Sequence, residues 1–357
     1  MIKFIHAADF HLDSPFAGLS GEKSALRRRE LREIPARLAQ LVREQGADLL
    51  LLPGDLFDGE RVCPETVEAL QSALGGLSIP VFIAPGNHDY FHSRSPYAAP
   101  WPENVHIFTD AALCGVEVES LNCVVHGCAF TDPHRTDDPL SGFAAPEDGR
   151  IHLLCVHGEV AQTGAYAPIS PASLAACGAE YAALGHIHAR SPIQRTGKTC
   201  WAYPGCPEGR GFDECGEKGA YLVSVDNGRV TGEFLPVGQR QYLIRPLELT
   251  GDPAGALPGE VSPHLVRILL RGEQARPLDL VRLERLWKER FFHLELRDET
   301  TLPRDLWARA GEDTLTGLFL RRMKERLDRA DEADIPKLLL AVRFGLTALE
   351  GGEDVRP

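Results

Sequence analysis

The chain has 357 residues, of which 43% are hydrophobic and 25% charged. This balance is typical of a globular protein with a sizeable core. The nine cysteines are odd in number and form no C-x-x-C pair, so they indicate neither a zinc knuckle nor a disulfide framework. The net charge of −13 argues against a passive DNA-coating protein, which would need a basic surface. It does not exclude a nuclease, because carboxylates that hold metal ions are counted in this charge.

The first two thirds of the chain alternate short apolar runs with helical patterns, which is typical of a layered α/β domain. The predicted helices are residues 24–44, interrupted near Pro35, and residues 64–74. The predicted strands are residues 2–8, 48–52, 80–84, 122–126, 151–156, 181–184 and 221–225. No apolar run reaches the ~18 residues of a membrane helix, so we expect a soluble, cytoplasmic protein with a first domain over residues 1–238.

A second part begins near residue 239. Strands at 241–249, 264–270 and 291–296 enclose a helix at 278–288, which predicts a small α+β domain over residues 239–301. Residues 302–357 form a helical segment with predicted helices at 314–327 and 336–349. The last helix is apolar almost all round, so it should be buried either within the chain or against another chain.

Polar side chains of the types that bind metals follow five of the predicted strands. They are Asp9 and His11, Asp55, Asn87, His157, and His186 and His188. In extended backbone, residues two apart project to the same side, which applies to the first pair and to the last. Ligands of open α/β sheets bind outside the carboxyl ends of the strands, where we expect all seven residues to meet.

The donor types predict the kind of metal. Imidazole nitrogens with carboxylate and amide oxygens, and no thiolates, suit divalent ions such as Mn²⁺, Fe²⁺ or Zn²⁺, with Mg²⁺ an alternative. Seven ligands suit two ions that share one carboxylate, for which Asp55 is the candidate. Two ions ~3.5–4 Å apart activate water for attack at phosphorus.

These motifs carry a resemblance. The order Asp9-x-His11, Gly54-Asp55-x-x-Asp58, Gly86-Asn87-His88-Asp89, His157, Gly185-His186-x-His188 resembles the calcineurin-like metallophosphoesterase superfamily. Within it, the chain is most similar to the SbcD-type DNA repair exonucleases. The opening residues 5–16 and the later Tyr203-Pro204-Gly205 with Gly209-Arg210 resemble the YhaO-like branch.

The resemblance implies a layered β-sheet sandwich flanked by helices, and a division of the ligands. One ion would be held by Asp9, His11, Asp55 and His188, and the other by Asp55, Asn87, His157 and His186. His88 would contact the scissile phosphate and assist the leaving oxygen, oriented by Asp89. Asp58 and Asp13 are expected to support the ligands without binding metal. Arg210, which follows the last ligand pair, is a candidate for contact with DNA phosphates, and a solvated surface position is the alternative.

The resemblance also implies a reaction and partners. Family members use Mn²⁺, degrade double-stranded DNA from 3′ ends, and cut single strands when joined to an SMC-like, SbcC-like coiled-coil ATPase. Residues 239–301 would be the capping domain that helps to hold DNA. Residues 302–357 would dock on the ATPase, and a homodimer is possible.

Other readings of the sequence remain. The same two-metal site would serve a phosphodiesterase or phosphatase acting on nucleotides or other small phosphoesters. A catalytically silent scaffold is opposed by the complete ligand set. His6, His106, His126, His134, His152, His264 and His293 have no motif around them and are predicted to be structural, whereas His92, four residues after His88, is a candidate to line the cleft. The polarity of degradation, the ion used in the cell and the oligomeric state do not follow from the sequence.

Overall fold

The computed structural model describes residues 1–59, 61–251, 253–256 and 261–349. The chain divides into two compact units, Met1–Gln241 and Tyr242–Pro357. Each unit has hydrophobic clusters of its own. Residues 350–357, which end the predicted C-terminal helical segment, lie outside the described residues.

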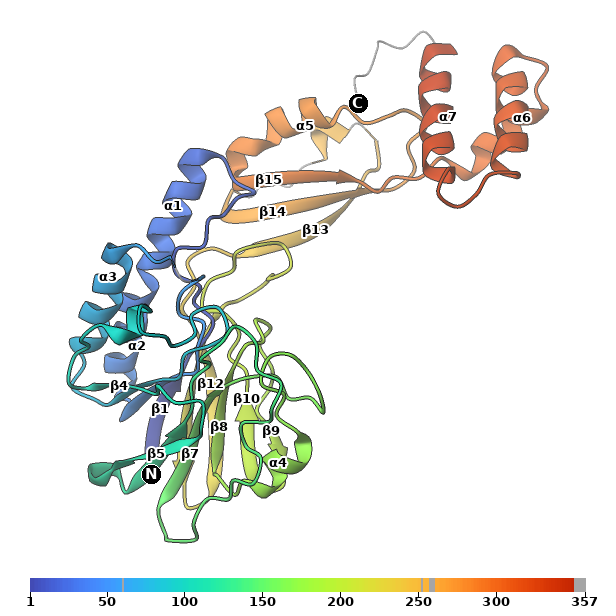
Figure 1. The fold of residues 1–357 in the computed structure, drawn as a ribbon. Coiled ribbons are helices and arrows are strands. Elements are labelled where there is room, and N and C mark those ends of the chain that lie inside the picture. The colour runs from blue at the N-terminus through green and yellow to red at the C-terminus, as the bar shows by residue number, and fades with distance from the viewer. Residues whose placement is uncertain (60, 252, 257–260, 350–357) are drawn as a thin grey trace. The chain divides into compact units, whose positions relative to one another are not determined.

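The first unit contains two six-stranded sheets (Figure 1). The first sheet has the order β12-β11-β1-β2-β3-β4. Its strands are β1 (Ile2–His6), β2 (Leu49–Leu52), β3 (Val81–Ile83), β4 (Val105–Ile107), β11 (Gly219–Asp226) and β12 (Arg229–Pro236). The second sheet has the order β5-β6-β7-β8-β10-β9. Its strands are β5 (Cys114–Val118), β6 (Cys123–Gly127), β7 (Ile151–His157), β8 (Tyr181–Gly185), β9 (Gln194–Thr196) and β10 (Thr199–Ala202).

The two sheets pack face to face because alternate strand residues point to opposite sides. Phe4 and Leu51 of the first sheet share a buried cluster with Leu153 and Tyr181 of the second. The intervening residues of the first sheet pack on α1 (Gly21–Arg32), α2 (Ile34–Gln45) and α3 (Pro64–Gly75). The outer face of the second sheet is covered in part by α4 (Pro171–Ala176). The predicted α/β sandwich flanked by helices is therefore confirmed.

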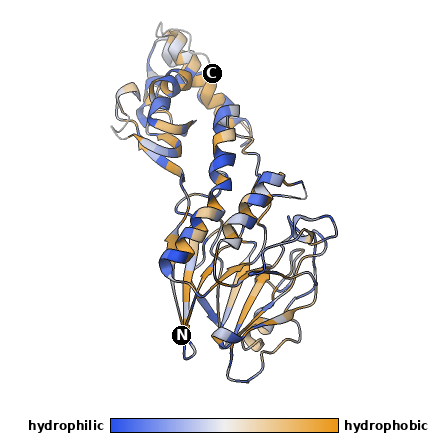
Figure 2. Ribbon diagram, turned by 90° about the vertical axis from the view of Figure 1, so that its left-hand side faces the viewer, coloured by the Kyte–Doolittle hydropathy of each residue, from blue (hydrophilic) through white to orange (hydrophobic). Residues whose placement is uncertain are grey.

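The sequence patterns missed the edge strands β4, β5, β9 and β12, and also the internal, buried strand β10. β12 and β5 are edge strands with largely exposed residues, so their sequences lack the apolar runs that mark the central strands. The central strands β2, β3 and β8 are buried throughout. In Figure 2 the strands of this unit are predominantly in the hydrophobic colour.

The second unit begins with a parallel three-stranded sheet of order β13-β14-β15. Its strands are β13 (Tyr242–Glu248), β14 (Ser262–Arg271) and β15 (Phe291–Asp298). The helix α5 (Leu280–Trp287) buries Leu283 and Trp287 against Val266, Ile268 and Leu294. The predicted order of two strands, a helix and a strand is confirmed for the described residues.

Two further helices follow, α6 (Leu315–Leu327) and α7 (Ile335–Leu349). Leu320 and Met323 of α6 pack against Val342 and Leu346 of α7. The sequence predicts that α7 is buried either within the chain or against another chain. One face packs within the chain, whereas Leu340 is 44% exposed. Short 3-10 turns lie at Pro96–Ala98, Glu119–Leu121, Pro253–Gly255, Lys288–Arg290 and Arg304–Gly311. Among the described helices, none is both long and apolar enough to cross a bilayer.

Candidate metal centre

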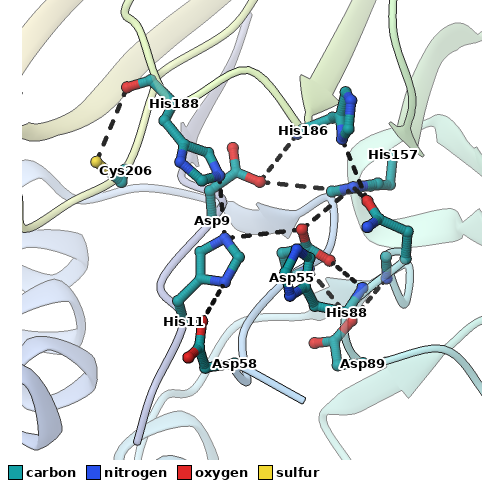
Figure 3. A network of polar contacts seen from close by, with 12 residues as sticks. Asp9, His11, Asp55, Asp58, His88, Asp89, His157, His186, His188 and Cys206 are labelled. Carbon is teal, nitrogen blue, oxygen red and sulfur yellow. Dashed lines mark hydrogen bonds and ion pairs between the residues drawn. The ribbon is translucent and has the colours of Figure 1, made fainter. Parts of the chain in front are cut away.

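The structure brings all seven predicted ligands together at the carboxyl ends of the central strands. All of them except Asn87 are labelled in Figure 3. The first sheet supplies Asp9 and His11 after β1, Asp55 after β2 and Asn87 after β3, and the second sheet supplies His157 at the end of β7 and His186 and His188 after β8. One group joins Asp9, His11, Asp55 and His188, whose ligand atoms lie within 4.8 Å of one another. A second group joins Asp55, His157 and His186 on the same criterion. Asp55 belongs to both groups, as a bridging carboxylate would.

The backbone that presents these side chains is not extended. β1 ends at His6, and Asp9 and His11 have φ angles of 57° and 47°. Asp55 (φ 51°) and His186 (φ 104°) also lie in the left-handed region, which non-glycine residues adopt at a cost. The expectation that each pair projects from extended backbone is therefore wrong. Asp9 and His11 are held instead by their backbone N–H groups, which donate to the carbonyls of Gly54 and Asp55.

The two sheets approach closely beside the site. Nδ1 of His157 donates to the carbonyl of Pro53 across the sandwich at 3.0 Å. A Cβ atom on Gly185 would lie 1.8 Å from that same carbonyl oxygen. A glycine at the end of β8 is therefore required for ligands from the two sheets to meet.

The tautomers of the first group are fixed by carboxylates. Nδ1 of His11 lies 3.0 Å from Oδ1 of Asp58, and Nδ1 of His188 lies 2.7 Å from Oε1 of Glu214. Each Nδ1 therefore carries the proton, and each Nε2 carries a lone pair. The two Nε2 atoms are 3.0 Å apart. Two lone pairs facing at this distance repel each other unless a cation lies between the ligands.

The second group has the same property. Because Nδ1 of His157 donates to Pro53, its Nε2 is an acceptor, and it lies 2.9 Å from Oδ1 of Asn87. Nδ1 of His186 lies 3.2 Å from that same oxygen. The Nε2 lone pair of His157 and the amide oxygen of Asn87 are thus two acceptors that face each other, as at a divalent-ion site.

The buried carboxylates also fit cations. Oδ1 of Asp9 accepts from the backbone N–H of His186, while Oδ2 is buried without a hydrogen-bond partner. Burial, and then the neighbouring Asp55, raises the pKa of Asp9 well above its usual value. Burial, followed by Asp89, raises the pKa of Asp55 to about 7. Two carboxylates this buried are stabilised as anions by divalent ions, so the donor set fits the two metals that the fold implies.

His88 is exposed beside this cluster, with its ring centroid 4.8 Å from that of His11. Its backbone N–H donates to Oδ1 of Asp55 at 2.9 Å. Its ring also lies close enough to His11 and Asp58 to form a third possible metal-binding group. It is therefore placed to reach both solvent and a group bound at the metals.

Asp89 has a different task from the one expected. Its carboxylate accepts hydrogen bonds from the backbone N–H groups of Gly86, Asp55, Leu56 and Phe57, and from the hydroxyl of Tyr97. Asp89 thus fixes the two ligand-bearing loops to each other, and it does not hold the His88 ring among the described contacts. No sequence pattern had indicated Tyr97.

The other predicted residues divide into two kinds. Asp58 contacts His11, as a supporting residue would. Asp13 instead accepts bonds from Arg32, Thr66 and the backbone of Cys63, and it contacts no ligand among the described residues.

Arg210, a candidate for contact with DNA phosphates, is already paired. It donates to Asp58 at 3.0 Å and to Glu214 at 2.9 Å. Sequence reasoning missed Glu214, although a carboxylate four residues after Arg210 in a glycine-rich segment was a usable signal.

Comparison with known proteins identifies relatives of this arrangement. Residues 2–190 match the family described as calcineurin-like phosphoesterase. The chain is also similar to the uncharacterized metallophosphoesterase YhaO of Bacillus subtilis strain 168. The two are 28% identical over an aligned length of 372 residues, and the alignment covers 94% of this chain and 89% of that relative. All seven clustered ligands lie in the matched range 2–190, whereas Arg210, Glu214 and the second unit lie beyond it.

Proposed function

Because the chain belongs to the calcineurin-like phosphoesterase family, we propose that it is a DNA nuclease of the SbcD type. It would be a Mn²⁺-dependent 3′→5′ exonuclease on double-stranded DNA with endonuclease activity on single strands, acting in DNA repair. Membership of the family makes it a hydrolase that uses divalent metal ions to cleave phosphoesters. The observation that carries it is the convergence of imidazole lone pairs from both sheets on the buried carboxylates of Asp9 and Asp55.

The chain's own residues have separable tasks in this reaction. Asp9, His11, Asp55 and His188 would hold one ion, and Asp55, Asn87, His157 and His186 the other. When bound, such ions supply an activated water and stabilise charge on the phosphoryl oxygens. His88, exposed at the edge of the cluster, contacts the phosphate and gives a proton to the leaving oxygen. Asp89 keeps the Asp55 and His88 loops together.

DNA as the substrate is supported by the resemblance to SbcD-type nucleases and by the second unit. A small-substrate phosphoesterase has no need of Tyr242–Pro357, and the similarity to YhaO extends over 94% of the chain. This unit holds half of the 38 lysines and arginines in a third of the sequence. Most of the net charge of −13 therefore lies in the first unit, and the second is better suited to meet phosphates.

A direct test compares substrates in Mn²⁺. A 5′-labelled duplex, a single strand and a hairpin are incubated beside bis-p-nitrophenyl phosphate and a cyclic nucleotide, with Asp55→Ala as the inactive control. Phosphorothioate linkages at the 3′ ends should block duplex degradation, whereas the same linkages at the 5′ ends should not. Turnover of the small substrates alone would favour the alternative, a nucleotide phosphodiesterase or phosphatase.

We propose further that α6 and α7 dock on a coiled-coil ATPase. Leu315 and Leu318 of α6 are 68% and 47% exposed, and Leu340 of α7 is 44% exposed. Exposed leucines on a helix pair are typical of a surface that packs on another helix. The test is co-purification with an SMC-like ATPase, which Leu315→Glu with Leu318→Glu should abolish while bis-p-nitrophenyl phosphate turnover persists. Light scattering of the chain alone tests the possible homodimer.

A further inference from the structure

One arginine links the two histidines that face each other in the first ligand group. Nη1 of Arg210 lies 3.0 Å from Oδ1 of Asp58, which accepts from His11, and Nη2 lies 2.9 Å from Oε1 of Glu214, which accepts from His188. Nη2 also lies 3.0 Å from Nδ1 of His188. Nη2 of Arg210 and a protonated Nδ1 of His188 are both donors, so they cannot bond to each other. We therefore assign a hydrogen bond from each of them to the Glu214 carboxylate.

Glu214 is buried, and the hydrogen bonds described for its carboxylate all involve His188 or Arg210. It is 7% exposed, and its second oxygen, Oε2, accepts from the backbone N–H of Arg210 at 2.7 Å. Oε1 of Glu214 lies 2.7 Å from Nδ1 of His188 and accepts from Nη2 of Arg210 at 2.9 Å. Both carboxylate oxygens of Glu214 are therefore engaged by donors, and one of these donors is the ring of a ligand.

The same segment of chain also holds the backbone of His188. The carbonyl of His188 accepts from Nζ of Lys218 at 3.2 Å and from the backbone N–H of Cys206 at 3.3 Å. Figure 3 shows Cys206 beside this carbonyl. Residues 206–218 thus fix both the ring and the main chain of one ligand, although the segment contributes no ligand itself.

In the part of the chain that the structure describes, no carboxylate supports the second ligand group in this way. Nδ1 of His157 donates to a neutral backbone carbonyl, that of Pro53, rather than to a carboxylate. An imidazole that donates to a carboxylate is a stronger base and is more firmly oriented than one that donates to a carbonyl. The two ion sites therefore differ in their surroundings, not only in their ligands.

We propose that Glu214 and Arg210 are positioning residues that set the affinity of the site formed by Asp9, His11, Asp55 and His188. Glu214 orients His188 directly, and Arg210 orients His11 through Asp58. This inference rests on the two-metal part of the proposed function and is independent of DNA as the substrate. It makes the two sites unequal, with the first site the tighter one.

The test is titration of the metal-free protein with Mn²⁺ by calorimetry, and with Co²⁺ by visible absorption. Wild type should bind two ions. Glu214→Ala should weaken one of the two sites by ~10–100-fold and alter the Co²⁺ spectrum of that site. Glu214→Gln keeps an acceptor for the His188 proton, so it should recover part of the affinity. Arg210→Met should weaken the same site.

Glu217→Ala is the matched control. Glu217 is exposed and lies three residues after Glu214. Both residues line a cavity of about 340 Å³ beside His188. Removing this carboxylate should leave both sites unchanged. If Glu214→Ala titrates like Glu217→Ala, the inference is overturned.

Asp55→Ala separates this failure from failure of the metal centre itself. Loss of metal in Asp55→Ala with normal binding by Glu214→Ala would overturn the positioning role alone. Normal binding by Asp55→Ala would overturn the metal centre. If circular dichroism shows that Glu214→Ala does not fold, Glu214→Gln and Arg210→Met decide. The proposal would be contradicted if Glu214→Gln bound two ions with wild-type affinity and the wild-type Co²⁺ spectrum, and if Arg210→Met also bound both ions with wild-type affinity.

Discussion

His88 shows how placement separates a catalytic group from a ligand. It is exposed, whereas His11 and His157 are buried with both ring nitrogens engaged. We expect His88→Ala to lower kcat by ~10²–10⁴ because a proton donor to the leaving oxygen is lost. Metal binding by calorimetry should be unchanged.

A different result for His88→Ala would be informative. His88 also lies near enough to His11 and Asp58 to share an ion with them. If the variant lost an ion together with its activity, His88 would be a ligand and its assignment as the proton donor would be wrong. Asn87→Ala provides the comparison, since it should lose metal affinity.

His6 illustrates a buried histidine whose neutral form is built into the core. Its Nε2 lies 3.1 Å from the carbonyl of Leu184 and its Nδ1 lies 3.1 Å from the hydroxyl of Tyr181, so it joins β1 to β8. Burial lowers the pKa of His6 to about 3, although the bond to Leu184 opposes this. The folded state therefore binds fewer protons than the unfolded state, in which the pKa is about 6.5.

This shift predicts a pH dependence of stability. The contribution of His6 is fully present above pH 6.5 and is lost as the pH falls toward 3. At about 1.4 kcal/mol per pH unit, it amounts to roughly 2–3 kcal/mol between pH 6.5 and 4.5. His6→Gln should be less stable than wild type at pH 6.5 and above. Urea unfolding of the metal-free proteins at pH 6.5 and 4.5 should show a smaller loss of unfolding free energy for His6→Gln than for wild type. Parallel pH profiles for the two proteins would rule the explanation out.

At the scale of elements, the approach of β8 to the end of β2 determines whether the site can form. A Cβ on residue 185 would lie 1.8 Å from the carbonyl oxygen of Pro53 and 3.0 Å from Nδ1 of His157. We expect Gly185→Ala to push the two sheets apart, and a displacement of ~1 Å at a catalytic site costs about 10²-fold. Metal affinity and turnover should both fall by at least that factor.

Gly18→Ala is the control for this substitution. Apart from Gly18 itself and its two chain neighbours, no described residue has an atom within 4 Å of a Cβ built at Gly18, so that variant should bind metal and turn over as wild type does. Equal behaviour of Gly185→Ala and Gly18→Ala would show that the sheets can separate without disturbing the ligands.

The sequence predicted those elements whose apolar pattern reports burial. β1, β2, β3, β7 and β8 are largely buried strands, and a polar residue of a metal-binding type lies at the end of each or shortly after it. Both the strands and the converging ligands were therefore foreseeable. The left-handed φ angles of Asp9 and Asp55 were not, because local sequence favours such backbone only weakly in residues other than glycine. They arise from hydrogen bonds between loops far apart in the chain.

Long-range pairing also explains why Glu214 and the true task of Asp89 were missed. Glu214 is 26 residues from His188, and Asp89 bonds to backbone groups more than 30 residues away. A sequence reports which side chains can accept a hydrogen bond. It does not report which donors the folded chain places beside them.

At the scale of the whole molecule, the division at residue 241 predicts that chemistry and DNA handling separate. The unit Met1–Gln241 contains all seven clustered ligands together with His88, Glu214 and the sandwich core. Nothing in the described metal centre comes from Tyr242–Pro357. We therefore expect residues 1–241 alone to fold, to bind two ions and to hydrolyse bis-p-nitrophenyl phosphate within about threefold of the full chain.

Activity on duplex DNA should distinguish residues 1–241 from the full chain. Without the more basic second unit, the remaining chain carries most of the net charge of −13, and its attraction for a polyanion is reduced. Its kcat/KM on a labelled duplex should fall by ~10–100-fold, and the deficit should be smaller at high salt because salt screens the lost contacts. A shortened chain that degrades duplex DNA as fast as the full chain would assign DNA binding to the catalytic unit. In that case the second unit would serve partner docking alone.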